Sequence, residues 1–83
     1  VHVRLFPNPA EEWSRLRYTL ERPGHVRISI HDAAGRTLDH VLDRARPAGA
    51  HEQLLDLRGL PASPYIVTIT TGQGLVVRQL IVR

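Results

Sequence analysis

Five histidines, eight acidic residues and three serines are the side chains here that could support nucleophilic or acid–base chemistry. A serine nucleophile needs a histidine base within hydrogen-bond reach. Ser29 is expected to point outward on a strand and Ser14 to stand at a strand start, and neither sits in an elbow motif. The sequence therefore predicts no catalytic residues, and we expect that the chain is not an enzyme.

Metal binding is the second chemistry that these residues could support. No histidines are spaced H-x-H or H-x3-H, and there is no cysteine. His25 and His31 share one face of a strand but lie about 20 Å apart, at roughly 3.3 Å per residue. Asp39 and Asp43 could lie on one face, but glycosidase chemistry would need a cleft around such a pair, and Asp32 is expected to cap its own turn. We expect no metal site and no cofactor, with a site assembled across strands left open.

The charge balance excludes further classes of function. The net charge is +3, but all eleven basic residues are arginines, scattered among acids rather than clustered with exposed aromatics. Nucleic-acid binding is therefore not expected.

No apolar run approaches the roughly 18 residues that span a membrane, and the first residues do not have the basic-then-apolar pattern of a signal segment. Because methionine is absent, we expect a piece of a longer protein.

Apolar residues recur with a period of two, which places one face of a strand on a core and the other in water. The clearest case is Val26, Ile28 and Ile30 alternating with Arg27 and Ser29. No apolar stripe of helical period extends beyond one turn. The segments predicted as strands are Val1–Phe6, Ser14–Leu20, His25–His31, Thr37–Asp43, His51–Leu57, Tyr65–Thr71 and Leu75–Arg83.

About seven short strands separated by turn residues predict an all-β, immunoglobulin-like antiparallel two-sheet sandwich that forms a single domain over residues 1–83. Tyr65 opens the sixth strand, where a tyrosine corner would join its phenol to an upstream backbone group. Phe6 and Tyr18 are expected in the core with Tyr65, and Trp13 at its edge. The last strand is apolar on both faces, so its inward side is ambiguous.

Four motifs follow one another in a fixed order along the chain. They are an aromatic-Pro-Asn-Pro opening, an Asp-x-x-Gly-Arg hairpin, a glycine before the fifth strand, and a leucine followed by a small-residue turn and a tyrosine. Their residues are Phe6, Pro7, Asn8, Pro9, Asp32, Gly35, Arg36, Gly49, Leu60 and Tyr65, with Arg78 and Arg83 in the final strand. Together these motifs resemble the C-terminal sorting domain of type IX secretion. Arg78 stands where that family usually has a lysine and Arg83 where it has a basic residue at the end, whereas His31 and Ser63-Pro64 depart from the family pattern.

The resemblance implies a sorting signal that directs a covalently linked upstream cargo protein. The domain would fold in the periplasm and be recognised by the outer-membrane secretion machinery. A surface sortase-like peptidase would then remove it, leaving the cargo at the cell surface or secreted. The hypothesised recognition residues are those of the terminal strand, Arg78, Leu80, Ile81, Val82 and Arg83.

Two other interpretations stay open on the sequence alone. A fibronectin-like accessory or adhesion module would share the sandwich and the turn before Tyr65. The immunoglobulin-like domain of the flagellar hook-capping protein resembles the central motifs as well.

Overall fold

The structure, a computed structural model, describes residues 2–83. All of its regular elements are strands, and no helix in these residues is long and apolar enough to cross a membrane. The strands are β1 (Val3–Phe6), β2 (Trp13–Leu20), β3 (Gly24–His31), β4 (Thr37–Arg46), β5 (Gly49–Asp56), β6 (Ser63–Thr71) and β7 (Gly74–Val82).

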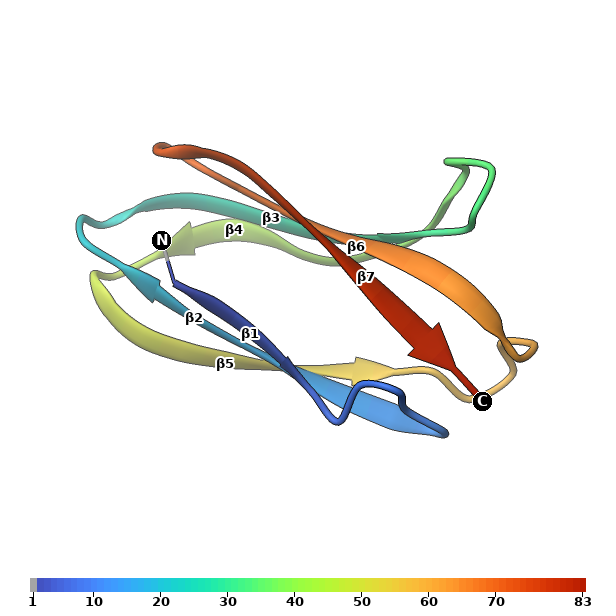
Figure 1. Cartoon of the computed structure of the whole chain (residues 1–83). Helices are drawn as coiled ribbons and strands as arrows, with labels where there is room; N and C mark the ends of the chain where they lie inside the picture. Colours follow the sequence, from blue (N-terminus) through green and yellow to red (C-terminus); the bar gives the residue numbers. More distant parts are fainter. Residues whose placement is uncertain (1) are drawn as a thin grey trace.

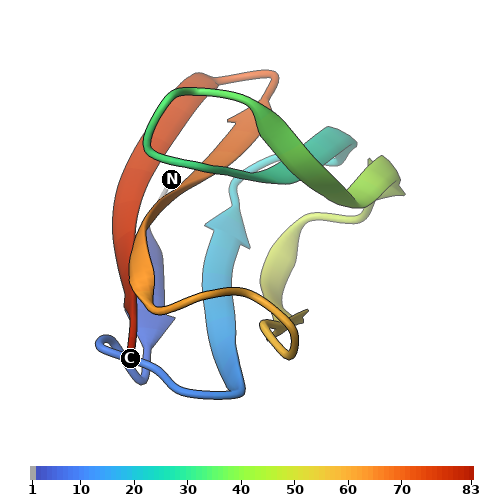
Figure 2. The same ribbon diagram turned by 90° about the vertical axis from the view of Figure 1, so that its right-hand side faces the viewer.

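The strands form two antiparallel sheets that face each other. One has the order β1-β2-β5 and the other β4-β3-β6-β7 (Figure 1). Viewed along the strands, β1 and β7 lie on the same side of the sandwich, with β4 and β5 on the other (Figure 2). A parallel bridge between Ala10 and Val82 connects the sheets on the β1–β7 side. The predicted immunoglobulin-like two-sheet sandwich is confirmed.

Side-chain alternation explains the core between the sheets. In β2, the residues at alternate positions are buried while Arg15, Arg17 and Thr19 face water. Burying a large apolar side chain contributes about 1.5–3 kcal/mol, so each clean alternation specifies which face of its strand turns inward. The fully buried apolar residues include Leu16, Tyr18, Val26, Ile28, Ile30, Leu55, Leu57, Val67, Ile69 and Leu80.

The edge strand β4 departs from the simple alternation. Its pairing with β3 shifts twice, between Ile28 and Ser29 and again between Ile30 and His31. The first shift, which skips Val41, places Asp43 opposite the outward Arg27 but Asp39 opposite the buried Ile30. Asp39 and Asp43 therefore do not share the face that the sequence allowed them, because this bulge inserts one extra residue between them and changes the alternation.

Two aromatic residues lie away from the places that the sequence predicted for them, the core for Phe6 and the core edge for Trp13. Phe6 pairs with Arg15 on the outer face of the three-stranded sheet, and Arg17 lies 5.5 Å from its ring centre. Trp13 is 45% exposed on the same face, with the Arg15 guanidinium 5.1 Å from its ring centre. Arginine over an aromatic ring is favourable and keeps part of the ring from water. These cation–π contacts replace the core packing that was expected.

The strand boundaries follow the predictions to within two residues, except at β4, and Val1, where the first predicted strand begins, lies outside the described residues. That strand continues to Arg46, three residues beyond the predicted end, because its last residues pair with the start of β3 at Gly24–Val26. Edge residues exposed on both sides carry no alternation of apolar and polar residues, so the sequence pattern could not extend β4.

Ser29 does point outward on β3, but it is buried, and its hydroxyl lies 3.2 Å from His40 Nδ1.

Candidate functional site

The terminal strand β7 is the element that the sequence singles out for recognition. Its register with β6 turns Val76, Leu80 and Val82 toward the core. Leu75 and Val77 face outward and are 62% and 50% exposed, while Ile81 on the same face is half-buried. The ambiguity of the sequence pattern is thus resolved: the even-numbered residues point inward, and the odd-numbered apolar residues form an outer stripe.

The edge of β7 is closed near its end by the segment Pro7–Ala10, which connects β1 to β2. Asn8 Nδ2 donates to the carbonyl oxygen of Gln79 at 2.8 Å, and the Ile81 N–H donates to Asn8 Oδ1 at 3.0 Å. Ala10 continues this ladder: its N–H donates to the Ile81 carbonyl, and the Arg83 N–H donates to the Ala10 carbonyl, both at 2.8 Å. The first and the last family motif are therefore hydrogen-bonded to each other.

The Pro7–Ala10 segment is held on its other side by β2. The buried Ser14 hydroxyl donates to the Pro7 carbonyl at 2.9 Å. Ala10 is itself buried. A hollow at this end of the sandwich is lined by Pro7, Pro9, Ala10, Glu11, Glu12, Trp13 and Arg83.

The recognition residues predicted from the sequence divide into two groups. Leu80 and Val82 are buried, so their side chains hold β7 on the core. Arg78 and Arg83 are exposed, and neither forms an ion pair with any described residue. Arg78 Nη1 donates to the Val77 carbonyl at 3.0 Å. The surface of this strand end is thus cationic, and the half-buried Ile81 lies on the face of β7 opposite to Arg78.

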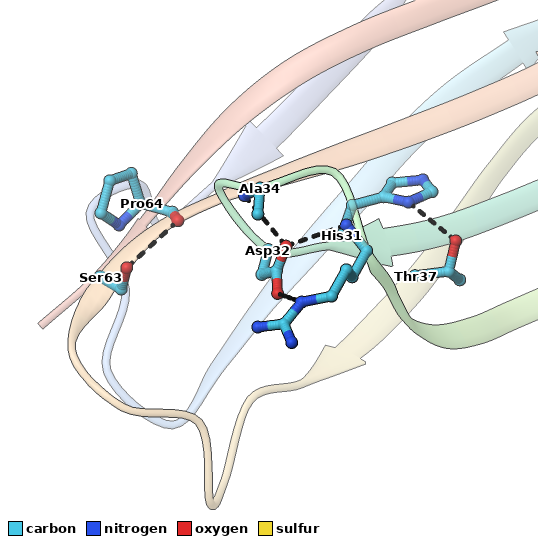
Figure 3. A network of polar contacts seen from close by, with 7 residues as sticks. His31, Asp32, Ala34, Thr37, Ser63 and Pro64 are labelled. Carbon is cyan, nitrogen blue, oxygen red and sulfur yellow. Dashed lines mark hydrogen bonds and ion pairs between the residues drawn. The ribbon is translucent and has the colours of Figure 1, made fainter.

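Asp32 organises the hairpin between β3 and β4, as its turn-capping role predicted. Its Oδ1 accepts from the Ala34 and Arg36 N–H groups at 3.0 and 2.9 Å, and its Oδ2 accepts from Arg36 Nε at 2.8 Å. The backbone N–H of Arg36, and next its guanidinium, lower the pKa of the Asp32 carboxyl. Gly35 has φ 88°, a conformation that side chains disfavour. Figure 3 shows the Asp32 carboxylate turned toward Ala34.

The crossover from β5 to β6 carries the predicted tyrosine corner. Tyr65 is buried, and its phenol donates to the Pro61 carbonyl at 2.6 Å. Leu60 packs partly buried against the core, and its N–H donates to the Leu57 carbonyl at 3.1 Å. The hydrogen bond fixes the turn that moves the chain from one sheet to the other.

Gly49 is the last of the family-motif residues, and the histidines and carboxylates are the remaining side chains that could support chemistry. Gly49 begins β5 with φ 116°, a value that explains why glycine stands there. His25 contacts Asp43, a contact that lowers the pKa of this carboxyl. Among residues 2–83, no three histidines or carboxylates come together in a group that could hold a metal ion.

Sequence reasoning missed two parts of this site. The hydrogen bonds of Asn8 and Ala10 to β7 join residues more than 70 positions apart, and no local pattern reports such a contact. The second is the cationic cover over Phe6 and Trp13. Arginines alternating along β2 beside aromatic residues were a signal for it.

Comparisons with known proteins agree with this geometry. The chain is similar to the crystal structure of dimeric latent PorU from Porphyromonas gingivalis, with a TM-score of 0.74 and 22% identity. The likeness covers 96% of this chain but only 9% of the PorU chain, so it shows the fold alone. A search of curated proteins found no match.

A family of sequences matches residues 4–83, nearly the whole chain, and is described as a secretion system C-terminal sorting domain. The match contains each of the motifs located above, from Pro7-Asn8-Pro9 to β7. The chain therefore belongs to the secretion system C-terminal sorting domain family, and it is a sorting signal of type IX secretion.

Proposed function

We propose that β7 and the Pro7–Ala10 segment together form the surface that the outer-membrane secretion machinery recognises. The observation that carries this proposal is the direct hydrogen bonding of Asn8 to Gln79 and Ile81. It makes the two most distant family motifs one structural unit. A partner that contacts the end of β7 meets both motifs at once.

Within this surface, the exposed residues are proposed to contact the partner. Arg78 and Arg83 supply positive charge that no described acidic residue neutralises, and Ile81 supplies apolar area on the face of β7 opposite to Arg78. Leu80 and Val82 act indirectly, because their buried side chains keep β7 in place. Charged groups at such a surface steer association and set specificity.

Membership in the sorting family supports a wider proposal for the pathway. A type IX sorting signal serves export across the outer membrane, to the surface or the medium. We propose in addition that residues 1–83 fold as one domain in the periplasm, covalently linked to an upstream cargo protein. A surface sortase-like peptidase then removes this domain. The continuous core between the two sheets supports folding as one unit.

The test is export of a reporter protein fused ahead of this chain in a bacterium with type IX secretion. The variant Arg78→Glu/Arg83→Glu reverses the charge at β7, and Arg22→Glu/Arg44→Glu applies the same charge change at exposed arginines elsewhere. We expect the first variant to lower export at least about tenfold, which corresponds to about 1.4 kcal/mol of lost recognition. The control is expected to leave export unchanged.

Two results would contradict the proposal. Equal export of both variants, with melting temperatures like the unmodified chain, would show that the β7 surface is not read. A reporter that stays in the periplasm with the unmodified chain attached would contradict the sorting role in that host. Truncation of Leu80–Arg83 also removes core residues, so circular dichroism must accompany it.

A further inference from the structure

The edge of β7 is closed along only half of its length. The backbone groups of Ile81 and the carbonyl of Gln79 are bonded by Asn8 and Ala10. Toward the start of the strand, no residue among 2–83 forms a strand pair with this edge. The sorting domain thus presents a strand whose end is capped and whose first half is open.

The open groups can be identified from the alternation of an antiparallel strand. Such a residue points its N–H and its C=O to the same side, and neighbouring residues point to opposite sides. The N–H and C=O of Ile81 and the N–H of Arg83 point away from β6, so the backbone groups of Leu75 and Val77 do so as well. The free groups are therefore the N–H and C=O of Leu75, the N–H of Val77 and the N–H of Gln79. The Val77 carbonyl accepts only from the neighbouring Arg78 side chain.

Side chains on both faces of this open edge suit an added strand. Leu75 and Val77, each at least half exposed, form an apolar row on the outer face. On the other face, Arg78 is exposed and has no acidic partner among residues 2–83. An edge with unpaired backbone groups and apolar side chains is a template for strand addition.

We infer that the open edge of β7, from Leu75 to Gln79, accepts an extended strand of the secretion machinery that carries a carboxylate beside Arg78. This inference rests on the proposed function, in which that machinery reads β7. The added strand pairs with about five residues and stops at Gln79, because Asn8 occupies the edge beyond it. Backbone bonds supply affinity, and the carboxylate next to Arg78 supplies specificity.

Charge favours this occupant over a second copy of the chain. Antiparallel pairing of two β7 edges about Val77 would place each Arg78 opposite the Val76 of the other copy. The two arginines would then be diagonal neighbours, about 7–8 Å apart, and would repel each other. A strand with an acidic residue at this position removes the repulsion and pairs the unpaired cation.

The substitution Val77→Pro tests the edge directly. It removes an N–H that points away from β6 and leaves the β6–β7 hydrogen bonds in place, as proline on an edge strand allows. Val77→Thr keeps the N–H and the branched side chain and is the matched control. We expect the proline variant to lower reporter export at least about tenfold, or about 1.4 kcal/mol, and the threonine variant to export normally. Circular dichroism and melting temperature verify folding.

A second variant covers the case in which the proline variant does not fold. Leu75→Lys/Val77→Lys changes only exposed side chains and places at the edge the charges that block strand addition. We expect the same loss of export from this variant. Normal export by the folded proline or lysine variant would overturn the inference. If Arg78→Glu/Arg83→Glu still abolished export, the proposed function would stand although the inference of an added strand had failed.

Light scattering of the isolated chain tests whether a second copy of the chain occupies the β7 edge instead of the secretion machinery. We expect the same mass for the unmodified chain and for Val77→Pro across concentrations. A concentration-dependent dimer that the proline variant abolishes would overturn the inference, because it would assign the edge to a second copy.

Discussion

Replacing Asn8 by alanine removes the side chain that joins the first motif to the terminal strand. Two hydrogen bonds are lost, one to the Gln79 carbonyl and one from the Ile81 N–H. The bonds of Ala10 remain, so the segment stays attached at its other end. The substitution therefore loosens the closed part of the β7 edge without removing core volume.

The magnitude follows from the exposure of these bonds. A hydrogen bond contributes about 0.5–1.5 kcal/mol net, and an exposed one lies at the low end because water replaces the lost partner. Both bonds are exposed, so Asn8→Ala is expected to lower the free energy of unfolding by about 1 kcal/mol. For a domain of this size that lowers the melting temperature by about 4–8 °C.

Hydrogen exchange gives the residue-level assay. The Ile81 amide is expected to exchange about fivefold faster in Asn8→Ala, as about 1 kcal/mol implies. Gln73→Ala is the matched control, because it removes an exposed side-chain hydrogen bond, the 3.0 Å bond to Glu21, away from the Pro7–Ala10 segment. Ile81 is therefore expected to stay protected in that variant.

Unchanged exchange of Ile81 in Asn8→Ala would refute this reasoning, because it would show that Asn8 does not close the edge. Equal loss of protection at Ile81 in Asn8→Ala and Gln73→Ala would refute it too. In that case the faster exchange would come from a general loss of stability and not from opening of the β7 edge.

Three further predictions concern the stability of the fold. Tyr65→Phe removes the 2.6 Å bond to Pro61 and is expected to lower the free energy of unfolding by about 1 kcal/mol in a denaturant titration; no change would contradict the corner. Leu80→Ala empties a fully buried site and is expected to cost about 2–5 kcal/mol, whereas Arg78→Ala is expected to stay within about 0.5 kcal/mol. The lowered pKa of Asp32 means that its charged form stabilises the fold above the unfolded value of 3.8 and that this contribution is lost as pH falls below it. Melting temperatures of the unmodified chain and Asp32→Asn should therefore converge on acidification from pH 7 to pH 2, and a constant difference would argue against the cap.

Local patterns in the sequence predicted most of the fold. Period-two alternation located the seven strands, and in β2, β3 and β6 it also identified the inward face. Turn chemistry predicted the roles of Asp32 and Tyr65, because each bonds to a backbone group four residues away or fewer. Short-range interactions of this kind can be predicted from the types and spacing of neighbouring residues.

The remaining features depend on contacts that neighbouring residues do not encode. The bulges of β4 depend on how an edge strand fits the twist of β3, so the sequence allowed Asp39 and Asp43 one face that the structure does not give them. Phe6 was assigned to the core and Trp13 to its edge, because large aromatics are usually buried. Arginine side chains from neighbouring positions cover them instead. The apolar sequence of β7 fits either face, and only its pairing with β6 decides between them.

The position of Trp13 gives this chain a built-in optical probe. It is the sole tryptophan, it is 45% exposed, and it lines the same hollow as Arg83. Its ultraviolet emission therefore reports on the hollow beside Arg83 without an added dye. A ligand that settles there should shift this fluorescence toward the blue as water leaves the indole, so that titrations can be followed with the unlabelled protein.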